Sequence, residues 1–503
     1  MKKVVTIVCL ILLQLIWMAI VLFKFSYTYT YVNYGIRLIA VCVVIYMINQ
    51  WKNLSSKLSW TFLILLSPGF GLLLYLIFGR KNVTKHTAKK MDAYIRLAQK
   101  HTYQTPAINR FLKEQDKAVY RQTKYINDWS GYPVYQNTET KYYKSGEDMF
   151  PDMLVELEKA RHYIFLEYFI VEEGYMFNQI LEVLERKAKV GVDVRLIYDD
   201  VGSIATLPEQ YYETLKSKGI KCAAFNPFRP SLSVLMNNRD HRKIMVADGT
   251  VGFTGGINLA DEYINQVERY GYWKDTGVRL NGEGVWSLTL MFLSMWDCIN
   301  EEEEDYEKFR PQENDKKELA SDGVVQPYCD CPLNTEYVCE TVYMNIINQA
   351  MEYLYIFTPY LIIDNEMLTA LCNTAKRGVD VRIVTPGVPD KRMIFWLTQS
   401  YYQPLIASGV KIYQYRPGFL HAKSFLCDDK IATVGSVNLD YRSLYLHFEC
   451  GIYMYRTKAV FELKQDCMEV FATSDEITIE FCKKQSLFIK LLQCVMRLIA
   501  PLC

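Results

Sequence analysis

The chain has 503 residues and half of them are hydrophobic, so its composition allows a large core and several domains. Its 57 Lys and Arg residues balance 56 Asp and Glu residues, which excludes nucleic-acid binding through a high net positive charge. The balance is uneven along the chain, because residues 1–91 contain no acidic side chain.

Three apolar runs within residues 1–80 predict a membrane region of two or three transmembrane helices. Val4–Phe23 carries no charge and is close to the ~20 residues that cross a bilayer. Leu38–Ile48 is shorter, and Trp60–Phe78 is expected to kink at Pro68. No small-residue cleavage site follows the first run, so we interpret it as an uncleaved anchor. The alternative is a set of buried helices in a soluble domain.

A basic run follows the membrane region and predicts which side of the membrane the rest of the chain occupies. The sequence GRKNVTKHTAKK at 79–90 holds five Lys or Arg residues, and such clusters mark the cytoplasmic side. The 14 cysteines show no disulfide or zinc spacing, which indicates a reducing compartment. We therefore expect a multi-pass protein of the cell membrane with cytoplasmic soluble domains. Three full spans would separate Lys2 and Lys3 from the basic run, so the number of spans and the side of the N-terminus stay open.

The rest of the chain contains an internal repeat. YIFLEYFIV at 163–171 is echoed by YIFTPYLII at 355–363, and KVGVDVRLIYD at 189–199 is echoed by KRGVDVRIVTP at 376–386. Each copy reads as apolar strands alternating with helices, which is typical of α/β units.

The repeat predicts two homologous α/β domains after a basic helical linker at 81–130. We place the first domain at 131–310 and the second at 311–503, with the boundary in the charged, aperiodic stretch 300–325. The last stretch, 486–502, is amphipathic and is expected either to lie on the bilayer or, as we favour, to pack on the second domain.

Each copy of the repeat also contains the motif H-x-K-x-x-x-x-D followed by G-[GS]-x-N. The copies are HRKIMVADGTVGFTGGIN at 241–258 and HAKSFLCDDKIATVGSVN at 421–438. The repeated polar positions are His241, Lys243, Asp248 and Asn258 in the first copy and His421, Lys423, Asp428 and Asn438 in the second, which also has the polar Ser436.

The motif predicts an anion site. Side chains alternate along a strand, so the His and Lys of each copy point to the same face. An ammonium group beside an imidazole repels a metal cation but attracts a phosphate, and the imidazole can attack phosphorus or move protons. The Asn of each motif can donate to phosphoryl oxygens. A single copy of the motif could also be a half-exposed strand end before a glycine turn. This alternative is less favoured here, because two of the six histidines in the chain occupy the same position of the repeat. Two copies predict one pseudo-twofold site with a nucleophilic His and a general-acid His.

On these motifs the chain resembles the phospholipase D superfamily over roughly residues 130–503. The stretches KLSWTFLILLSPGFGLLLYLIFGR at 57–80 and NNRDHRKIMVADGTVGFTGGINLADEY further resemble bacterial cardiolipin synthases. The resemblance implies two phospholipase D-like domains, each a mixed sheet flanked by helices, related by a pseudo-twofold axis and preceded by a transmembrane region. It implies no cofactor and no metal.

The resemblance also implies site residues. The catalytic residues would be His241, Lys243, Asp248, His421, Lys423 and Asp428. Within this set the two Asp residues are expected to brace a strand and its turn and not to touch substrate. Asp275 and Glu449, each about thirty residues after the His of its own copy, are expected to accept a hydrogen bond from the imidazoles. Ser436, like Asn258 and Asn438, is expected to bind phosphate or to support the site. It stands where the first copy has Gly256, a difference to which we give little weight.

The reaction implied by the resemblance is phosphatidyl transfer between two phosphatidylglycerol molecules, which gives cardiolipin and glycerol through a phosphatidyl-histidine. The partners would then be these two lipids and the bilayer, with no nucleic acid. Aromatic side chains near the motifs are expected to wall the site against water: Phe225, Phe228, Phe419, Tyr168 and Tyr360. The alternatives are a membrane-bound hydrolase, a transferase to another alcohol, a nuclease and a non-catalytic membrane scaffold.

Overall fold

The computed structural model describes residues 29–50, 53–79, 85–227, 237–312, 319, 323–333 and 336–502, and six scattered residues before 29. Its chain forms two compact units, which are described separately below. The smaller unit comprises 1–85, 228–237 and 487–503, and the larger unit comprises 86–227 and 238–486. The first predicted span, Val4–Phe23, lies largely outside the described residues.

The smaller unit is built from apolar helices around a core that includes Ile64 and Tyr75. Its elements are α2 (Thr30–Ile48), α3 (Leu54–Leu66), α4 (Pro68–Leu74), the π-helical turn η1 (Tyr75–Gly79), α19 (Leu487–Ile499) and the turn η6 (Ala500–Leu502). Within the described part of the chain, α2 is the one helix long and apolar enough to cross a membrane, with 19 residues and a mean hydropathy of 1.8. It contains the predicted run Leu38–Ile48 and begins eight residues earlier.

The third predicted span is not one continuous helix. Helix α3 ends before Ser67, and Pro68 starts α4 as its first residue. A Cβ atom on Gly71 would lie 2.3 Å from the carbonyl oxygen of Leu63, so α4 folds back against α3. Proline lacks the N–H that would continue α3, and glycine permits the close approach. The expected kink is therefore a full break, and the expectation of a single span over Trp60–Phe78 is wrong.

The C-terminal helix α19 belongs to the smaller unit. It packs on α3 and on η6, whereas packing on the second α/β domain was favoured from the sequence. Leu487, Phe488, Leu491 and Val495 are all more than half exposed. These side chains share one apolar helix face, a pattern typical of helices that lie at a membrane surface.

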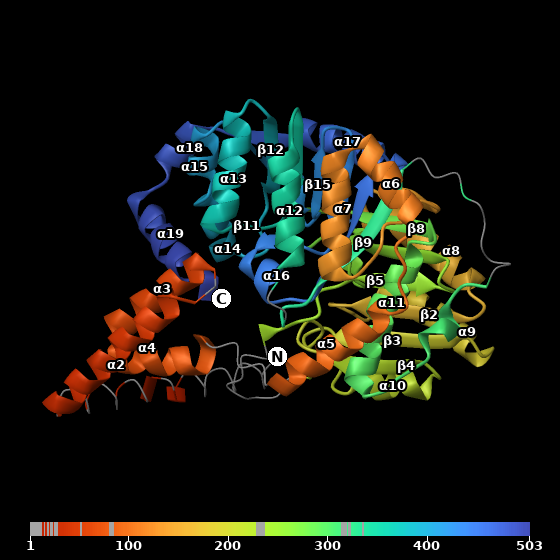
Figure 1. Ribbon diagram of the computed structural model, residues 1–503, viewed down its shortest axis with the longest axis horizontal. Coiled ribbons are helices and arrows are strands. Elements are labelled where there is room, and N and C mark those ends of the chain that lie inside the picture. The colour runs from red at the N-terminus through yellow and green to blue at the C-terminus, as the bar shows by residue number, and fades with distance from the viewer. Residues whose placement is uncertain are drawn as a thin grey trace. The chain divides into compact units, whose positions relative to one another are not determined.

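The larger unit contains two mixed sheets, as the repeat predicts (Figure 1). The first has the order β1-β8-β6-β5-β2-β3-β4, and the second has the order β9-β18-β16-β15-β10-β12-β13-β19 when read in the matching direction. Strand for strand the two orders correspond, and only β19 has no counterpart. The bounds are β1 Thr138–Tyr143, β2 Tyr163–Tyr168, β3 Asp193–Asp199, β4 Lys221–Phe225, β5 Ile244–Ala247, β6 Val251–Gly255, β8 Gly277–Gly282, β9 Val324–Asp330, β10 Tyr353–Phe357, β12 Asp380–Pro386, β13 Lys411–Tyr415, β15 Ser424–Cys427, β16 Ile431–Gly435, β18 Glu449–Tyr455 and β19 Ser474–Ile477.

Helices cover these sheets in equivalent places. The helix α11 (Val285–Asn300) lies on the first sheet and touches β9 of the second, while α17 (Lys458–Ala472) lies on the second sheet and touches β1 of the first. The hydrophobic core runs through both halves, so they fold as one body. The other helices are α5 Lys85–Gln99, α6 Pro106–Gln115, α7 Lys117–Ser130, α8 Gly146–Lys159, α9 Tyr175–Lys189, α10 Tyr211–Ser217, α12 Val338–Gln349, α13 Asn365–Lys376, α14 Arg392–Gln399, α15 Tyr402–Ala407, α16 Tyr441–Tyr445 and α18 Ile479–Lys484.

Two short parallel pairings join the halves next to the motifs. Strand β7 (Tyr272–Lys274) of the first half pairs with β14 (Gly418–Leu420) of the second, and Lys274 lies opposite Leu420. In the reciprocal place, Asp240 forms a bridge with Phe448. Both pairings end one residue before a motif histidine, so they determine what lies beside it.

Candidate active site

Each motif histidine is positioned by the other half of the molecule. The backbone N–H of His241 donates to the carbonyl of Phe448 at 2.9 Å, and that of His421 donates to the carbonyl of Lys274 at 2.7 Å. In parallel pairing the residues that follow a matched pair lie side by side. The next residues are His241 and Glu449 in one place and His421 and Asp275 in the other.

The carboxylates therefore pair with the histidines crosswise. His421 Nδ1 lies 2.6 Å from Asp275 Oδ2, and His241 Nδ1 lies 2.9 Å and 3.1 Å from the two oxygens of Glu449. Both histidines are 7% exposed and both carboxylates are fully buried. The predicted residue types are in contact, but the expectation that each carboxylate serves the His of its own copy is wrong. The Nδ1 contact leaves Nε2 of each ring for chemistry.

The two lysines are buried beside the histidines. Lys243 and Lys423 are each 1% exposed, and their ammonium groups donate to the carbonyl oxygens of His241 and His421. Burial lowers the pKa of Lys243 to about 8 and that of Lys423 to about 7. Burial also lowers the pKa of His241 well below its ordinary value, and charge on Lys243, Lys423 and His421 lowers it further. The two His-Lys pairs thus form one electrostatic cluster.

The pKa values of the two carboxylates are shifted in opposite directions. Burial opposes ionisation of Asp275, but His421 and Lys423 bring its pKa below the ordinary value. Burial raises the pKa of Glu449 well above the ordinary value, although Lys243 favours its ionised form. Asp275 is therefore a charged partner for His421, whereas Glu449 retains a proton more readily beside His241.

Asp248 and Asp428 brace strand ends, as expected for them. The carboxylate of Asp248 accepts hydrogen bonds from the backbone N–H groups of Arg161, His162 and Tyr163 at 2.7–2.9 Å. Asp428 does the same for Met351, Glu352 and Tyr353 at 2.8–2.9 Å. Neither carboxylate has a hydrogen bond to a motif histidine among the described residues, so a direct catalytic role for either stays a prediction.

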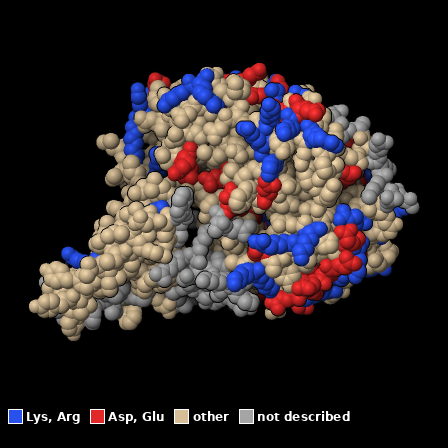
Figure 2. Space-filling view, in the orientation of Figure 1, with Lys and Arg blue, Asp and Glu red and all other residues tan. Residues whose placement is uncertain are grey.

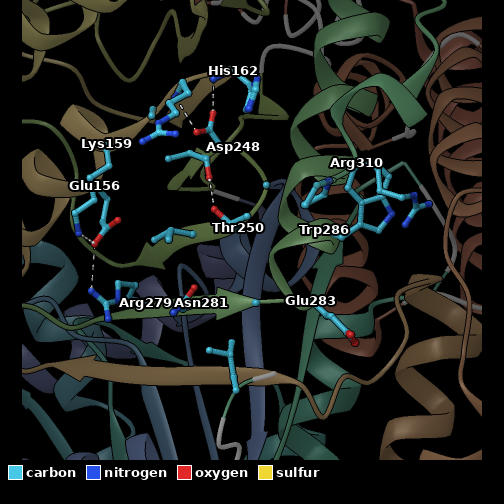
Figure 3. Close-up of a pocket in the computed structure, with 18 of the residues that line it drawn as sticks. Glu156, Lys159, His162, Asp248, Thr250, Arg279, Asn281, Glu283, Trp286 and Arg310 are labelled. Atoms are coloured by element: carbon cyan, nitrogen blue, oxygen red, sulfur yellow. Dashed lines mark hydrogen bonds and ion pairs between the residues drawn. The ribbon is translucent and has the colours of Figure 1, made fainter. Parts of the chain in front are cut away.

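A surface pocket of about 710 Å³ lies at the Asp248 turn (Figure 3). Strand β5 lies between this turn and His241 in the chain, and no motif histidine lines the pocket. Its walls mix positive and negative side chains, including Lys159, Arg279 and Glu156. Arg279 already lies 3.6 Å from Glu156 in an ion pair. The pocket is therefore separate from the His-Lys cluster.

Asp248→Asn is expected to lower the free energy of unfolding by about 1–3 kcal/mol, because three backbone donors lose a charged acceptor. Asn tolerates the left-handed backbone at this position, where φ is 52°, so the change isolates the carboxylate. Urea unfolding followed by circular dichroism measures the effect. Asp428→Asn is the matched variant in the second half, and stability unchanged in both variants would contradict the bracing role.

The residues after the glycines support the carboxylates. Ser436 Oγ donates to Glu449, whereas a Cβ atom on Gly256 would lie 2.0 Å from Asp275 Oδ1. The Gly/Ser difference between the copies thus follows from the Asp/Glu difference. Asn258 accepts from the N–H of Ile170 and donates to Tyr263, and Asn438 Oδ1 is buried without a partner among the described residues. A phosphoryl contact for either Asn stays a prediction.

Aromatic rings surround the cluster. Among the aromatic residues predicted to wall the site, Phe419 has its ring 5.8 Å from that of His421. Tyr360 packs against Phe419, and Phe225 packs against Phe448. Phe228 lies outside the described residues. Tyr168 is buried in the first-domain core.

Sequence reasoning missed four site residues. Phe169 lies 4.9 Å from the His241 ring, Trp273 and Tyr263 lie 5.3 Å and 5.5 Å from the His421 ring, and His447 lies 5.5 Å from the His241 ring. Trp273 stands two residues before Asp275, and His447 stands two residues before Glu449. Their closeness in sequence to the predicted carboxylates could have identified both as site residues.

One group in the described part of the chain has the composition of a metal site: His241, His447 and Glu449, whose ligand atoms lie within 4.8 Å of one another. Zinc uses such ligands. The ammonium groups of Lys243 and Lys423 act on the same imidazole and oppose a divalent cation there. We expect the enzyme to keep its activity in about 10 mM EDTA, a large molar excess over any ion bound to the protein. Loss of activity with EDTA and recovery with Zn²⁺ would contradict this expectation.

Acid is expected to destabilise the larger unit through His421. Its pKa is lowered to about 4 by burial and by Lys423, against an ordinary value near 6.5. The unfolded chain then binds a proton that the folded chain does not, so stability falls as pH drops from about 6.5 to about 4, by up to about 3 kcal/mol. Urea midpoints at pH 7 and pH 5 measure this. His421→Gln should show a smaller drop, and an equal drop would contradict the assignment.

Known proteins with related sequences share this organisation. Residues 153–269 and 343–472 match the family described as "Cardiolipin synthase, PLD-like domain", and residues 36–80 match "Phospholipase_D-nuclease N-terminal". The cardiolipin synthase of Alkalihalophilus pseudofirmus is 34% identical over 474 residues, which cover 94% of this chain and 93% of that protein. Cardiolipin synthase 2 of Bacillus anthracis is 34% identical over 91% of this chain and 88% of that protein. An uncharacterized protein of Streptococcus mutans is 44% identical over 91% and 99%.

Among solved structures, the phosphatidylserine synthase of Haemophilus influenzae Rd KW20 superposes with a TM-score of 0.57 at 15% identity, covering 76% of this chain and 96% of that one. At this identity the likeness shows the fold alone. Together with the family match over residues 153–269 and 343–472, it confirms the predicted class of two phospholipase D-like domains, each a mixed sheet flanked by helices.

Proposed function

Since this chain belongs to the cardiolipin synthase family of the phospholipase D superfamily and is therefore a phosphatidyltransferase, we propose that it joins two phosphatidylglycerol molecules into cardiolipin and releases glycerol. The observation that carries the proposal is the crossed pairing of His241 with Glu449 and His421 with Asp275. It supplies two oriented imidazoles, which is what a two-step exchange at phosphorus requires.

The reaction proceeds by two displacements. In the first, Nε2 of one histidine forms a bond to phosphorus and the bond from phosphorus to the glycerol headgroup oxygen breaks. The other histidine, protonated when the anionic phosphate is bound beside it, gives its proton to that oxygen. In the second, the same imidazole takes the proton from a hydroxyl of a second phosphatidylglycerol. That oxygen then bonds to phosphorus and the phosphorus–histidine bond breaks. Covalent catalysis divides one difficult exchange into two easier steps, and no nucleotide is consumed.

The remaining polar residues support these steps. Lys243 and Lys423 neutralise the phosphate oxygens, on which negative charge grows in the transition state. Asp275 and Glu449 fix the tautomer and the orientation of the two rings, and Ser436 holds Glu449 in place. Asp248 and Asp428 contribute through the fold.

The low exposure of the cluster favours transfer over hydrolysis. Water at ~55 M competes with any lipid hydroxyl for a phosphatidyl-histidine, so a synthase must exclude water and hold its acceptor. His241 and His421 are 7% exposed, and Phe169, Phe419 and Trp273 lie against their rings. These walls support the lipid alcohol as the acceptor.

We place the protein at the cell membrane, with the larger unit on the cytoplasmic face. Helix α2 is long enough to cross, and the surface of α2 to α4 carries few charged side chains (Figure 2). Leu38, Ile45, Leu58 and Phe62 are about half exposed or more there, which suits contact with lipid. The eleven described cysteines other than Cys482 are free thiols, in keeping with a reducing compartment.

The test is incubation of the purified protein in detergent with phosphatidylglycerol alone, followed by mass spectrometry of the products. Cardiolipin with an equal amount of glycerol is the expected result. Phosphatidic acid as the main product would establish a hydrolase instead. No conversion of the lipid would leave the scaffold alternative.

A further inference from the structure

A third histidine stands beside the His-Lys cluster without an assigned task. His447 lies between α16 and β18, and its ring centroid is 5.5 Å from that of His241. Its Nδ1 lies 3.9 Å from Glu449 Oε1, the oxygen that also pairs with His241 and is too far for a hydrogen bond to His447. The side chain is 9% exposed.

Neither ring nitrogen of His447 has a hydrogen-bond partner among the residues that the structure describes. Buried polar groups are nearly always paired, and an unpaired one calls for a ligand. Every other described group that touches His241 has a role: Glu449 orients it and Phe169 packs on it.

The ring is held in its neutral form. Burial lowers the pKa of His447 well below its ordinary value, and the positive charges of Arg442, Lys243 and Arg239 act in the same direction. A neutral imidazole has one N–H donor and one acceptor nitrogen. A phosphate oxygen could use only the donor, whereas a hydroxyl group can accept from the N–H or donate to the other nitrogen.

We propose that His447 binds the headgroup polyol, by hydrogen bonding to a hydroxyl next to the one that reacts. This inference rests on the proposed phosphatidyl transfer and adds a specificity-determining residue to it. The headgroup alcohol then lies on the side of the site formed by His241, His447 and Glu449. The substrate class is an alcohol with hydroxyls on adjacent carbons, as in a glycerol headgroup, and a simple monoalcohol lacks the second contact.

The experiment is a competition between two small acceptors. The full-length protein in detergent receives phosphatidylglycerol with equal concentrations of 1,2-propanediol and 1-propanol, and mass spectrometry measures the ratio of the two phosphatidyl alcohols. The wild type is expected to favour the diol by about tenfold or more, because a site built to bind a hydroxyl discriminates against the analogue without it. His447→Leu should bring the ratio within about twofold of one.

The ratio does not depend on how much protein is folded, so a general structural defect would leave it unchanged. His447→Gln keeps one donor and one acceptor and should retain part of the preference. His162→Leu changes an exposed histidine in the same way and should keep the wild-type ratio. If His447→Leu yields no product, the glutamine variant and His447→Asn decide by the same ratio.

The outcomes separate the two proposals. A wild type without diol preference, or a wild-type ratio in the His447 variants, overturns the assignment of His447 alone. Phosphatidyl alcohols without cardiolipin from phosphatidylglycerol overturn the proposed acceptor, and the ratio still decides on His447. Cardiolipin formed without either phosphatidyl alcohol overturns the assignment of His447 alone, and a wild type that forms neither cardiolipin nor a phosphatidyl alcohol overturns both.

Discussion

His241→Gln and His421→Gln are each expected to lower cardiolipin formation by at least about 10³-fold, because catalytic groups that act as a unit fail together. One imidazole forms the bond to phosphorus and the other moves the proton, so neither can replace the other. The two rings are held by opposite halves of the chain yet form one electrostatic cluster. The rate of the double variant should be within a few-fold of the rate of the slower single variant.

The measurement is the initial rate of cardiolipin release from phosphatidylglycerol in mixed micelles. His162→Gln serves as the control, because it makes the same change at an exposed position away from the cluster. Circular dichroism and urea midpoints confirm that the variants fold. A single variant that keeps a tenth of the wild-type rate would contradict the shared site.

Asp275→Asn is expected to lower the rate by about 10²–10⁴-fold through His421 and not through His241. The amide can present an N–H where the carboxylate accepts one, which favours the wrong tautomer of the ring. Glu449→Gln should act on His241 in the same way. Because Asp275 is the carboxylate with the lowered pKa, we expect the larger loss from Asp275→Asn.

Nitrogen-15 spectra of the histidine rings distinguish the crossed pairs from pairs within one repeat. In Asp275→Asn the resonances of His421 should shift while those of His241 stay in place, and Glu449→Gln should give the reverse. Six histidines make the assignment by single substitution practical. A shift of His241 in Asp275→Asn would contradict the contacts described above.

The sequence determined the parts of this protein that depend on local pattern. Short apolar runs, separated by helices and repeated once, predict two equivalent α/β domains. The H-x-K spacing brings an imidazole and an ammonium group together just before β5 and β15. The Asp that follows each strand explains the bracing by Asp248 and Asp428. These features arise within a few residues of one another, so a reader of the sequence can find them.

The tertiary structure decided which residues meet across the halves. His241 and Glu449 are 208 positions apart, and His421 and Asp275 are 146 apart. Their pairing depends on the register in which β7 meets β14 and Asp240 meets Phe448, and no local periodicity encodes that register. The same holds for His447, whose place beside His241 follows from that docking, and for the fold-back at Ser67, where Gly71 must approach Leu63. Contacts between segments that are distant in sequence depend on how complete sheets and helices pack together. That packing is a property of the folded chain and not of any short stretch of it.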